Sequence, residues 1–397
     1  MDSDKLNKMN IRRMRVLHLI HNFKFEGPGG GISRFGIDLC QHLNNEQIKV
    51  ILCGLGNYQT ESEFERMDML QSKGIEAFTL SEWGENHPYK SYLYANRNLQ
   101  FYIKKAKINI IHSHSEFSDI AALTIKPLRK KIRLIRTVHY GYKYEWKKRP
   151  FRRVIFSNFL IPLLYDKEVG VSMSITTRLN NRHLSKLLGK KAIYISSAIE
   201  LERFSQAKAN KSAIRTDLKI PKNSAIVGTI GRITEQKGYT YLIHAVSLVL
   251  SKFPDVYFLI IGDGELLPQL KYQAIQLGVN NNIRFLGGRS NIEDFLACMD
   301  LFVSSSLWEG LPASIMESMA AGIPIIATDV DGNRDLIENE VTGWLVPPYD
   351  FKALAKAIIN ALHSTDKNQE MVEKAKSLVQ DYSMETIARK YQALYLS

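Results

Sequence analysis

The chain has few cysteines for its length. Its 397 residues include three, Cys40, Cys53 and Cys298, which lie far apart and form no Cys-x-x-Cys pair. An odd number of widely separated cysteines supports neither a disulfide framework nor a zinc ribbon. We therefore expect a protein of a reducing compartment, and the cytoplasm is its predicted location.

Long hydrophobic runs are also missing. The longest nearly uncharged apolar run covers residues 154–165 and is interrupted by Ser157, Asn158 and Pro162, whereas a transmembrane helix needs about 20 apolar residues. The N-terminal stretch MDSDKLNKMNIRRMR contains no apolar core and no small-residue cleavage site. The sequence therefore predicts neither a transmembrane helix nor a secretory signal.

Acidic residues are scarce in the first half. The chain carries 53 Lys and Arg against 40 Asp and Glu, a formal net charge of +13, and residues 97–153 hold 16 basic and 3 acidic side chains. This excess favours an anionic partner, although a basic face that only aids solubility is the alternative. No RNA- or DNA-binding module is recognisable, so nucleic acid is not a predicted partner.

Short β-rich runs alternate with longer amphipathic ones, which is typical of parallel sheets with helical crossovers, so the predicted fold class is α/β. The expected strands form two doubly wound sets, separated by the polar stretch 208–211. The first set is 15–20, 49–54, 109–114, 134–139, 168–172 and 192–196, and the second is 225–230, 256–261, 283–286, 301–305, 324–328 and 343–346.

Neither Gly-x-Gly-x-x-Gly nor the P-loop motif occurs, which weakens the common dinucleotide and P-loop interpretations. A glycine run, Gly27-Pro28-Gly29-Gly30-Gly31, instead precedes a helical pattern over Ile32–Leu43. Backbone without Cβ atoms can approach a ligand closely, and free N–H groups at a helix start favour an anion or a hydroxyl. A merely flexible turn is the alternative.

A second strand-to-helix turn carries two cations. Arg232 and Lys237 lie in GRITEQKG, residues 231–238, directly before a helix predicted over Tyr239–Leu250. A guanidinium makes forked contacts to phosphate oxygens and an ammonium acts as a point charge, so the pair suits a diphosphate. Two solvated surface cations are the alternative.

The most specific segment is SSSLWEGLPASIMESMAAGIP, residues 304–324. Pro312 suits the start of a helix and Gly322 its end, which predicts a short helix between them. Glu309 then lies in the preceding loop, and Glu317 lies among Met, Ala and Ile residues. Because a buried carboxylate without a partner is unfavourable, Glu317 is predicted to meet a hydroxyl or a cation. Two ordinary polar residues are the alternative.

Together, the glycine run, GRITEQKG and the Glu-x7-Glu spacing of Glu309 and Glu317 resemble the retaining, nucleotide-sugar-dependent glycosyltransferases of family 4. The resemblance is strongest over residues 225–348. It implies the GT-B architecture, two Rossmann-like doubly wound parallel-sheet domains that face each other across a cleft. It also implies an acceptor-binding domain over 1–200, a donor domain over 201–378 and a C-terminal helix within 379–397 that returns to the N-terminal domain.

The resemblance assigns roles position by position. Arg232 and Lys237 match the pair that neutralises the donor diphosphate, and Glu317 matches the acid that accepts hydrogen bonds from the ribose. Arg289 lies in the loop that meets the base. The residues that the resemblance places around the transferred sugar are Gly30, Gly31, His139, Glu309, Gly310 and Leu311. Among these, Glu309 matches the group that holds sugar hydroxyls, and His139 matches the histidine beside the anomeric centre.

Some positions depart from the family pattern. Tyr140 follows His139 where Asp is common, residues 197–200 read Ser-Ala-Ile-Glu in place of Asn-Gly-Val-Asp, and Asp335 stands where Glu is commoner. The acceptor side is therefore left unassigned.

Two patterns contain metal-ligating residue types. Asp329-Val330-Asp331 matches a DxD motif at a position shared with metal-independent family members, so we interpret it as structural. His112 and His114 lie in one expected strand, where we expect them to face opposite sides of the sheet and not to share an ion. No metal and no other cofactor is predicted.

The predicted function is transfer of a hexose or N-acetylhexosamine from a nucleoside-diphosphate sugar to an acceptor hydroxyl with retention. The expected acceptor is a glycan or lipid-linked glycan of bacterial capsule, exopolysaccharide or lipopolysaccharide. Arginines interleaved with apolar residues over 147–165 suggest a segment lying on an anionic membrane surface at the inner face of the cell membrane, and a buried crossover helix is the alternative.

Other functions fit less of the sequence. A glycoside hydrolase would use Glu309 and Glu317 as paired carboxylates but would leave Arg232 and Lys237 without a role. A nucleotide-sugar 2-epimerase also has two Rossmann-like domains, and a non-catalytic binding protein is a third alternative. The pattern over 225–348 favours transfer.

Overall fold

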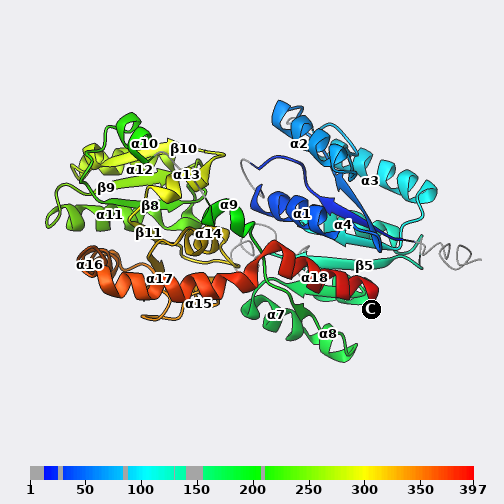
Figure 1. The fold of residues 1–397 in the computed structure, drawn as a ribbon. Coiled ribbons are helices and arrows are strands. Elements are labelled where there is room, and N and C mark those ends of the chain that lie inside the picture. The colour runs from blue at the N-terminus through cyan, green and yellow to red at the C-terminus, as the bar shows by residue number, and fades with distance from the viewer. Residues whose placement is uncertain (1–12, 26–29, 84–87, 129, 140–154, 207–210) are drawn as a thin grey trace, which may run out of the picture. The chain divides into compact units, whose positions relative to one another are not determined.

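The computed structural model describes residues 13–25, 30–83, 88–128, 130–139, 155–206 and 211–397 (Figure 1). The chain divides into two compact units. Unit 1 comprises Met1–Gly170, Thr176–Ile195 and Ala388–Ser397, and unit 2 comprises Val171–Ile175 and Ser196–Ile387. Each unit is built on one parallel sheet with helices against it, which confirms the predicted α/β class with two Rossmann-like domains.

Unit 1 contains a seven-stranded sheet in the order β3-β2-β1-β4-β5-β6-β7. Its strands are β1 (Met14–Ile20), β2 (Ile48–Gly54), β3 (Glu76–Thr79), β4 (Ile110–Ser113), β5 (Arg133–Val138), β6 (Lys167–Gly170) and β7 (Ile193–Tyr194). Six of them match expected strands. β3 was not among the expected strands, because this edge strand has four residues, of which Ala77 alone is buried, and so lacks an apolar run.

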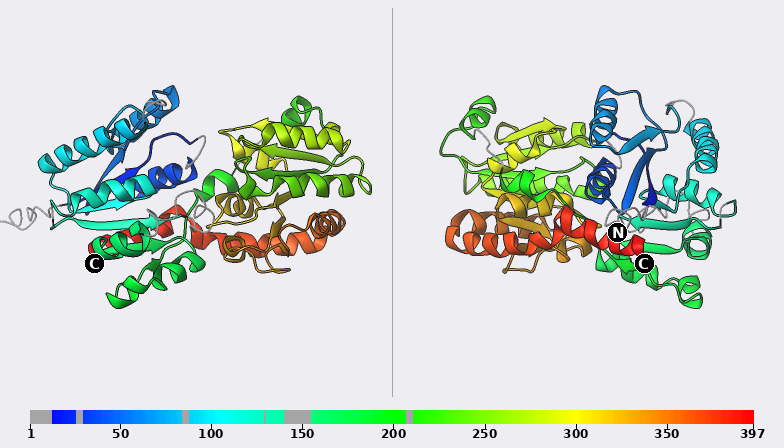
Figure 2. Two further views of the ribbon diagram at one scale, coloured as in Figure 1. Left: turned by 180° about the vertical axis from the view of Figure 1, so that it is seen from behind. Right: turned by 45° about the vertical axis from the view of Figure 1, so that its right-hand side comes forward.

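Helices cover both faces of this sheet. They are α1 (Gly30–Leu43), α2 (Glu61–Ser72), α3 (Pro88–Lys105), α4 (Glu116–Ile125), the π-helix η2 (Phe156–Leu160), α6 (Ile161–Leu164), α7 (Met173–Asn180), α8 (His183–Leu187) and the end of α18 (Met384–Leu396). The helices α3, α4 and α6 bury apolar side chains against Leu17 and Ile51 of the sheet in one cluster. The end of α18 lies along the other face (Figure 1 and Figure 2). There the hydroxyl of Tyr391 lies 2.9 Å from Thr137 Oγ1.

Unit 2 contains a six-stranded sheet in the order β10-β9-β8-β11-β12-β13. Its strands are β8 (Ile226–Ile230), β9 (Tyr257–Ile261), β10 (Ile283–Gly287), β11 (Leu301–Ser304), β12 (Ile325–Thr328) and β13 (Trp344–Val346), all at expected positions. Its longer helices are α11 (Tyr239–Leu250), α12 (Leu267–Gln276), α13 (Ile292–Ala297), α14 (Ala313–Ala321), α16 (Phe351–His363) and α17 (Thr365–Val379).

Short helices connect these elements: α9 (Leu201–Ser205), α10 (Lys211–Asp217), α15 (Asp331–Arg334), and the 3-10 turns η3 (Glu235–Lys237), η4 (Asn280–Asn282) and η5 (Gln380–Tyr382). The core of unit 2 is one cluster that joins α11 and α16 to the sheet through residues such as Ile243, Val246 and Ile358. Among the described residues, no helix combines the length and the apolar character needed to cross a bilayer.

Candidate active site

The sheet order of unit 2 brings its two most specific sequence motifs together. Strands β8 and β11 are parallel neighbours, with Leu301 opposite Val227. The chain continues from β8 to β9 on one side and from β11 to β12 on the other, so a topological switch point lies between them, where open α/β sheets bind ligands. The loops that follow these two strands contain residues 231–238 and 305–312.

Lys237 and Glu309 form an ion pair at this end of the sheet. Lys237 Nζ lies 2.6 Å from Glu309 Oε1, and the side chains are 18% and 6% exposed. Ser306 Oγ donates to the same carboxylate oxygen at 2.6 Å, and Gln236 Nε2 donates to Oε2 at 3.3 Å. A nearly buried carboxylate with one cationic and two neutral donors is held in one orientation.

Two glycines permit this close approach of the loops. Gly238 has a φ of 59°, and a Cβ there would lie 2.2 Å from the carbonyl oxygen of Ser305. Gly262 has a φ of 140°, and a Cβ there would lie 2.0 Å from the carbonyl oxygen of Gly231. Any side chain at either position would push the backbones apart. Both glycines are therefore required for the position of the Lys237 turn.

Arg232 lies on the same turn as Lys237 but in a different environment. Its side chain is exposed, and it forms no ion pair with any residue that the structure describes. Nearby, Tyr239 donates its hydroxyl to the carbonyl oxygen of Gly231 at 3.1 Å. Burial and the neighbouring Glu309 raise the pKa of this phenol, so Tyr239 remains a hydrogen-bond donor. The turn thus presents one exposed guanidinium and one ammonium bound to a carboxylate.

The helix that carries Glu317 lies between Pro312 and Gly322, as predicted. α14 begins at Ala313, with Pro312 as its N-cap, and ends at Ala321 before Gly322, whose φ of 73° is left-handed. Glu317 is buried in this helix. Gly310 and Leu311, in the loop before it, are also buried.

Arg289 follows β10 and is exposed. Its Nε donates to the carbonyl oxygen of Leu286 at 3.1 Å, and its guanidinium lies 5.7 Å from the centroid of the Phe295 ring. A planar guanidinium held over an aromatic ring is a surface on which a flat group can stack.

The predicted residues of unit 1 follow the first and fifth strands. Gly30 is tightly packed, since a Cβ there would lie 1.7 Å from the carbonyl oxygen of Phe25, whereas Gly31 faces open space. His139 follows β5, and its ring centroid lies 5.1 Å from that of Phe35. Burial lowers the pKa of His139 to about 3, which keeps the ring neutral near pH 7.

His139 Nε2 is buried and makes no hydrogen bond to any described residue. A small cavity of about 20 Å³ lies beside it, lined by His114, Ser115, Glu116, Asp119, Arg136, Thr137, Val138 and His139. A buried polar atom without a partner next to a cavity is a position at which a ligand hydroxyl can bind. This cavity is the candidate site of unit 1.

Three further histidines cluster in unit 1. The ring nitrogens of His18, His112 and His114 lie within 4.8 Å of one another. The expectation that His112 and His114 face opposite sides of the sheet was wrong, because side chains two residues apart on a strand point to the same face. Most of their nitrogens bind protein groups, with 3.0 Å between His18 Nδ1 and His114 Nε2 and 2.8 Å between His112 Nε2 and Thr137 Oγ1. The exception is His114 Nδ1, which is buried and has no hydrogen-bond partner among the described residues.

The end of α18 completes this histidine network. The hydroxyl of Tyr395 lies within hydrogen-bond distance of His112 Nδ1 and of His18 Nε2, and the hydroxyl of Tyr391 lies 2.9 Å from Thr137 Oγ1. Burial lowers the pKa of His18 to about 3. The histidines are therefore neutral hydrogen-bonding groups that join α18 to the sheet, and we interpret the network as structural.

The other face of the same strands carries a buried ion network. Arg136 is 1% exposed, and its Nη2 lies 3.1 Å from Asp119 Oδ2 and its Nη1 4.0 Å from Glu168 Oε2. Glu168 also pairs with Arg182, and Ser113 Oγ donates to Asp119 at 2.6 Å. Burial raises the pKa of Asp119 to about 6 although Arg136 opposes this shift.

The Asp-Val-Asp motif makes local contacts. Asp329 and Asp331 both pair with Arg334, and all three side chains are about half exposed. These contacts stabilise the short helix α15.

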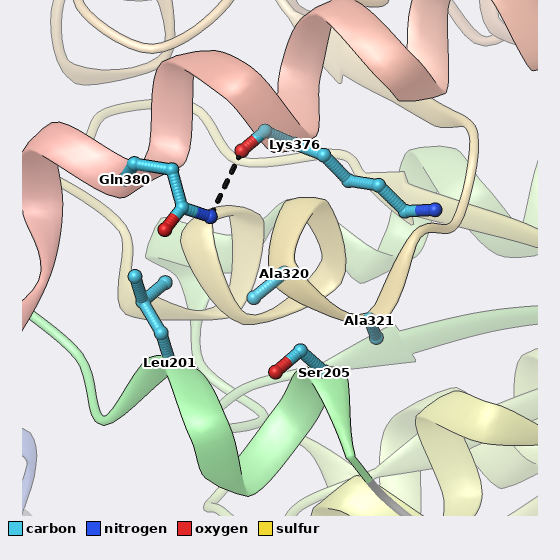
Figure 3. Close-up of a pocket in the computed structure, with 6 residues that line it drawn as sticks. All are labelled: Leu201, Ser205, Ala320, Ala321, Lys376 and Gln380. Atoms are coloured by element: carbon cyan, nitrogen blue, oxygen red, sulfur yellow. Dashed lines mark hydrogen bonds between the residues drawn. The ribbon is translucent and has the colours of Figure 1, made fainter.

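A larger cavity of about 300 Å³ lies elsewhere in unit 2 (Figure 3). Its lining residues are Leu201, Ser205, Ala320, Ala321, Lys376 and Gln380. None of them is a predicted site residue, although Ala320 and Ala321 lie on the helix that also carries Glu317.

Sequence reasoning missed two residues of the unit 2 site, Gln236 and Ser306, which bind Glu309. A signal for each was present. Gln236 lies inside GRITEQKG, and Ser306 ends a serine triplet that begins at the last residue of β11, at the strand end where open α/β sheets bind ligands.

Two family models match the chain. Residues 210–378 match "Glycosyl transferases group 1", and residues 29–181 match "Glycosyltransferase Family 4". A similar curated protein is the UDP-Gal:alpha-D-GlcNAc-diphosphoundecaprenol alpha-1,3-galactosyltransferase of Escherichia coli, 30% identical over 270 residues, which are 65% of this chain and 67% of that protein. The lipopolysaccharide core biosynthesis glycosyltransferase LpsE of Rhizobium meliloti is 33% identical over 46% of this chain and 53% of that protein.

Among solved structures, HepE of Anabaena in complex with UDP-glucose aligns with a TM-score of 0.78 at 21% identity. The alignment covers 97% of this chain and 99% of that one. At this identity the similarity shows the fold alone, and the alignment includes residues of both units.

Proposed function

Because the chain belongs to the family 4 glycosyltransferases and has their GT-B fold, we propose that it transfers a hexose or N-acetylhexosamine from a nucleoside-diphosphate sugar with retention of configuration. The acceptor is a glycan or a lipid-linked glycan in the biosynthesis of a cell-surface polysaccharide. The reaction takes place in the cytoplasm or at the inner face of the cell membrane, and it needs no metal ion.

The observation that carries this proposal is the Lys237–Glu309 pair at the switch point of unit 2. As the bond between the sugar and the diphosphate breaks, negative charge develops on the leaving group. An ammonium already fixed by a carboxylate can stabilise that charge with little reorganisation. Lys237 has three N–H donors, so it can bind a phosphate oxygen while one donor remains on Glu309.

The remaining site residues bind different parts of the donor. The exposed Arg232 supplies a forked contact to the diphosphate, and Glu317 accepts hydrogen bonds from the ribose. From the described residues, Glu309 Oε2 receives a single long hydrogen bond, from Gln236 at 3.3 Å, and it therefore has capacity for a sugar hydroxyl. His139, with its buried Nε2, is assigned by the family resemblance to the anomeric centre of the transferred sugar.

The names of the relatives support the choice of substrates. The Escherichia coli relative uses UDP-Gal and a diphosphoundecaprenol-linked acceptor, and the Anabaena structure contains UDP-glucose. We therefore place a uridine diphosphate sugar first among the donors to test and a polyprenyl-diphosphate-linked glycan first among the acceptors. A 2-epimerase or a glycoside hydrolase is not favoured, because the curated relatives named above are transferases.

A thermal-shift screen tests the donor site. The purified protein is heated with UDP, GDP, ADP, dTDP or CMP in the presence of EDTA, since a ligand that binds the folded state raises its melting temperature. We expect one nucleotide to give a selective shift that is lost in Arg232→Ala and retained in Arg215→Ala, a change in unit 2 away from the turn. No shift with any nucleotide would contradict the proposal, and a shift that requires a divalent metal would contradict its metal independence.

A further inference from the structure

Helix α3 has an unusual outer face. Its sequence PYKSYLYANRNLQFYIKK contains no acidic residue. The inner side buries Ala95, Leu99 and Ile103 in the core of unit 1. The residues that recur on the opposite side, at spacings of three or four, are Lys90, Leu93, Tyr94, Arg97, Phe101 and Lys104. All six are exposed.

The exposed side of an ordinary surface helix is polar, whereas this one carries three large apolar side chains. Leu93, Tyr94 and Phe101 are 67%, 62% and 59% exposed. Lys105 Nζ lies 4.3 Å from the centroid of the Phe101 ring, so charge and apolar surface are directly adjacent. A cluster of exposed apolar side chains of this kind is typical of an interaction surface.

The same layer of helices continues this surface. η2 and α6 pack on the same apolar cluster as α3, and α8 contacts α6. Lys190, in the chain just after α8, donates its Nζ to the carbonyl oxygen of Leu163 at 3.1 Å. On these short helices Phe159, Leu163 and Leu187 are exposed, and Leu187 is 82% exposed.

This finding refines the expectation for segment 147–165. Residues 147–154 lie outside the described residues. Within the described part, Ile161 and Tyr165 are buried in the core while Phe159 and Leu163 face outward. Residues 155–164 thus form a crossover helix that also exposes apolar groups.

We propose that α3, with η2, α6 and α8, forms a docking surface for a bilayer that contains anionic lipids. An acid-free helix that mixes lysine and arginine with aromatic and aliphatic side chains is suited to the membrane interface, where apolar groups enter the acyl boundary and cations remain at the phosphates. The proposal rests on the proposed function for its purpose, since a docked unit 1 meets an acceptor that is carried on a lipid.

Vesicle flotation of the full-length protein tests this surface. We expect binding to vesicles of phosphatidylcholine with phosphatidylglycerol, weak binding to phosphatidylcholine alone, and a loss of binding at high salt. Lys104→Glu/Lys105→Glu should lower the partition coefficient by at least about fivefold per lysine. Leu93→Ser/Phe101→Ser should lower it on the same vesicles without changing the salt dependence.

Matched changes in unit 2 serve as controls. Tyr272 and Ile275 of α12 are 64% and 60% exposed, so Tyr272→Ser/Ile275→Ser removes comparable apolar groups and should leave vesicle binding unchanged. Equal effects of the α3 and α12 variants, or binding that ignores anionic lipid, would overturn the proposal. The nucleotide thermal shift is measured on the same variants. If the unaltered protein shows the thermal shift but binds no vesicles of either composition, the docking surface is contradicted and the proposed function stands.

Discussion

Units 1 and 2 use their polar side chains in different ways. In unit 2, Lys237 and Glu309 meet in loops at the ends of neighbouring strands, and glycines make the approach possible. In unit 1, the polar groups lie within the layers themselves: a neutral histidine network on one face of the sheet and the Asp119–Arg136 network on the other. Unit 2 thus concentrates charge at the candidate donor site, while unit 1 uses buried polar groups to hold its own elements together.

This difference explains why the sequence revealed the candidate site residues of unit 2 more clearly than the buried polar networks of unit 1. A loop that must turn sharply needs glycine and proline at fixed spacing, so GRITEQKG and residues 304–324 stand out. Buried networks need partners that are distant in sequence, such as His112 and Tyr395, and no spacing pattern reveals them.

The largest effect on activity is expected when the ion pair of unit 2 is broken. Lys237→Met is expected to lower kcat by about 10²–10³, the loss typical for one group that stabilises developing charge. Glu309→Gln should also lower kcat, because it removes the carboxylate that fixes Lys237. Transfer is measured as nucleotide release in the presence of acceptor.

The matched control is an ion pair of the same type on the surface. Lys367 Nζ lies 2.7 Å from Glu340 Oε2, and both side chains are about half exposed. Lys367→Met should leave kcat unchanged and shift stability by less than about 1 kcal/mol. Similar losses in the Lys237 and Lys367 variants would remove the functional distinction that we draw for the buried pair.

Most of the fold was predictable, and the failures have physical causes. Every strand of unit 2 was expected because each contains a short apolar run, and β8, β9, β11 and β12 are also mostly buried. The edge strand β3 was missed because Ala77 is its one buried residue. The error over His112 and His114 arose from the wrong strand periodicity. Gln236 and Ser306 were overlooked because neutral donors become informative only when the carboxylate that they bind is known.

A change of pH should lower the stability of unit 1 more than that of unit 2. Burial lowers the pKa of His18 and His139 to about 3 and holds those of His112 and His114 well below 6.5. Between pH 6.5 and 3 the unfolded chain therefore binds more protons than the folded one, so stability falls as the pH is lowered. Each histidine contributes about 1.4 kcal/mol per pH unit.

Protonation of Asp119 has the opposite effect on stability over part of this pH range. Its pKa is raised to about 6, so the folded state gains a proton first as the pH falls toward 4. Four histidines outweigh one carboxyl group, and the net effect is loss of stability on acidification. Amide hydrogen exchange at pH 7 and pH 5, corrected for intrinsic rates, should show a larger loss of protection in β1 and β4 than in β8 and β9.

Two variants of the histidine network sharpen this test. His18→Gln removes one titrating ring and should reduce the pH dependence by about one proton. Tyr395→Phe removes hydrogen bonds to the same network without removing a histidine, and should lower protection at both pH values alike. A uniform loss of protection in both units would show that the buried histidines do not control the acid stability of unit 1.

The smallest effect is expected when the Asp-Val-Asp motif is changed. This change tests whether charged groups of unit 2 outside the candidate site are also needed for activity. Asp329 and Asp331 are half exposed and bind Arg334, and exposed pairs of this kind contribute about 0–1 kcal/mol. Asp329→Asn/Asp331→Asn should therefore change the melting temperature little and leave transfer in EDTA unaltered. Transfer that depends on a divalent cation, and that this double variant abolishes, would instead make the motif a metal site and add a second functional centre to unit 2.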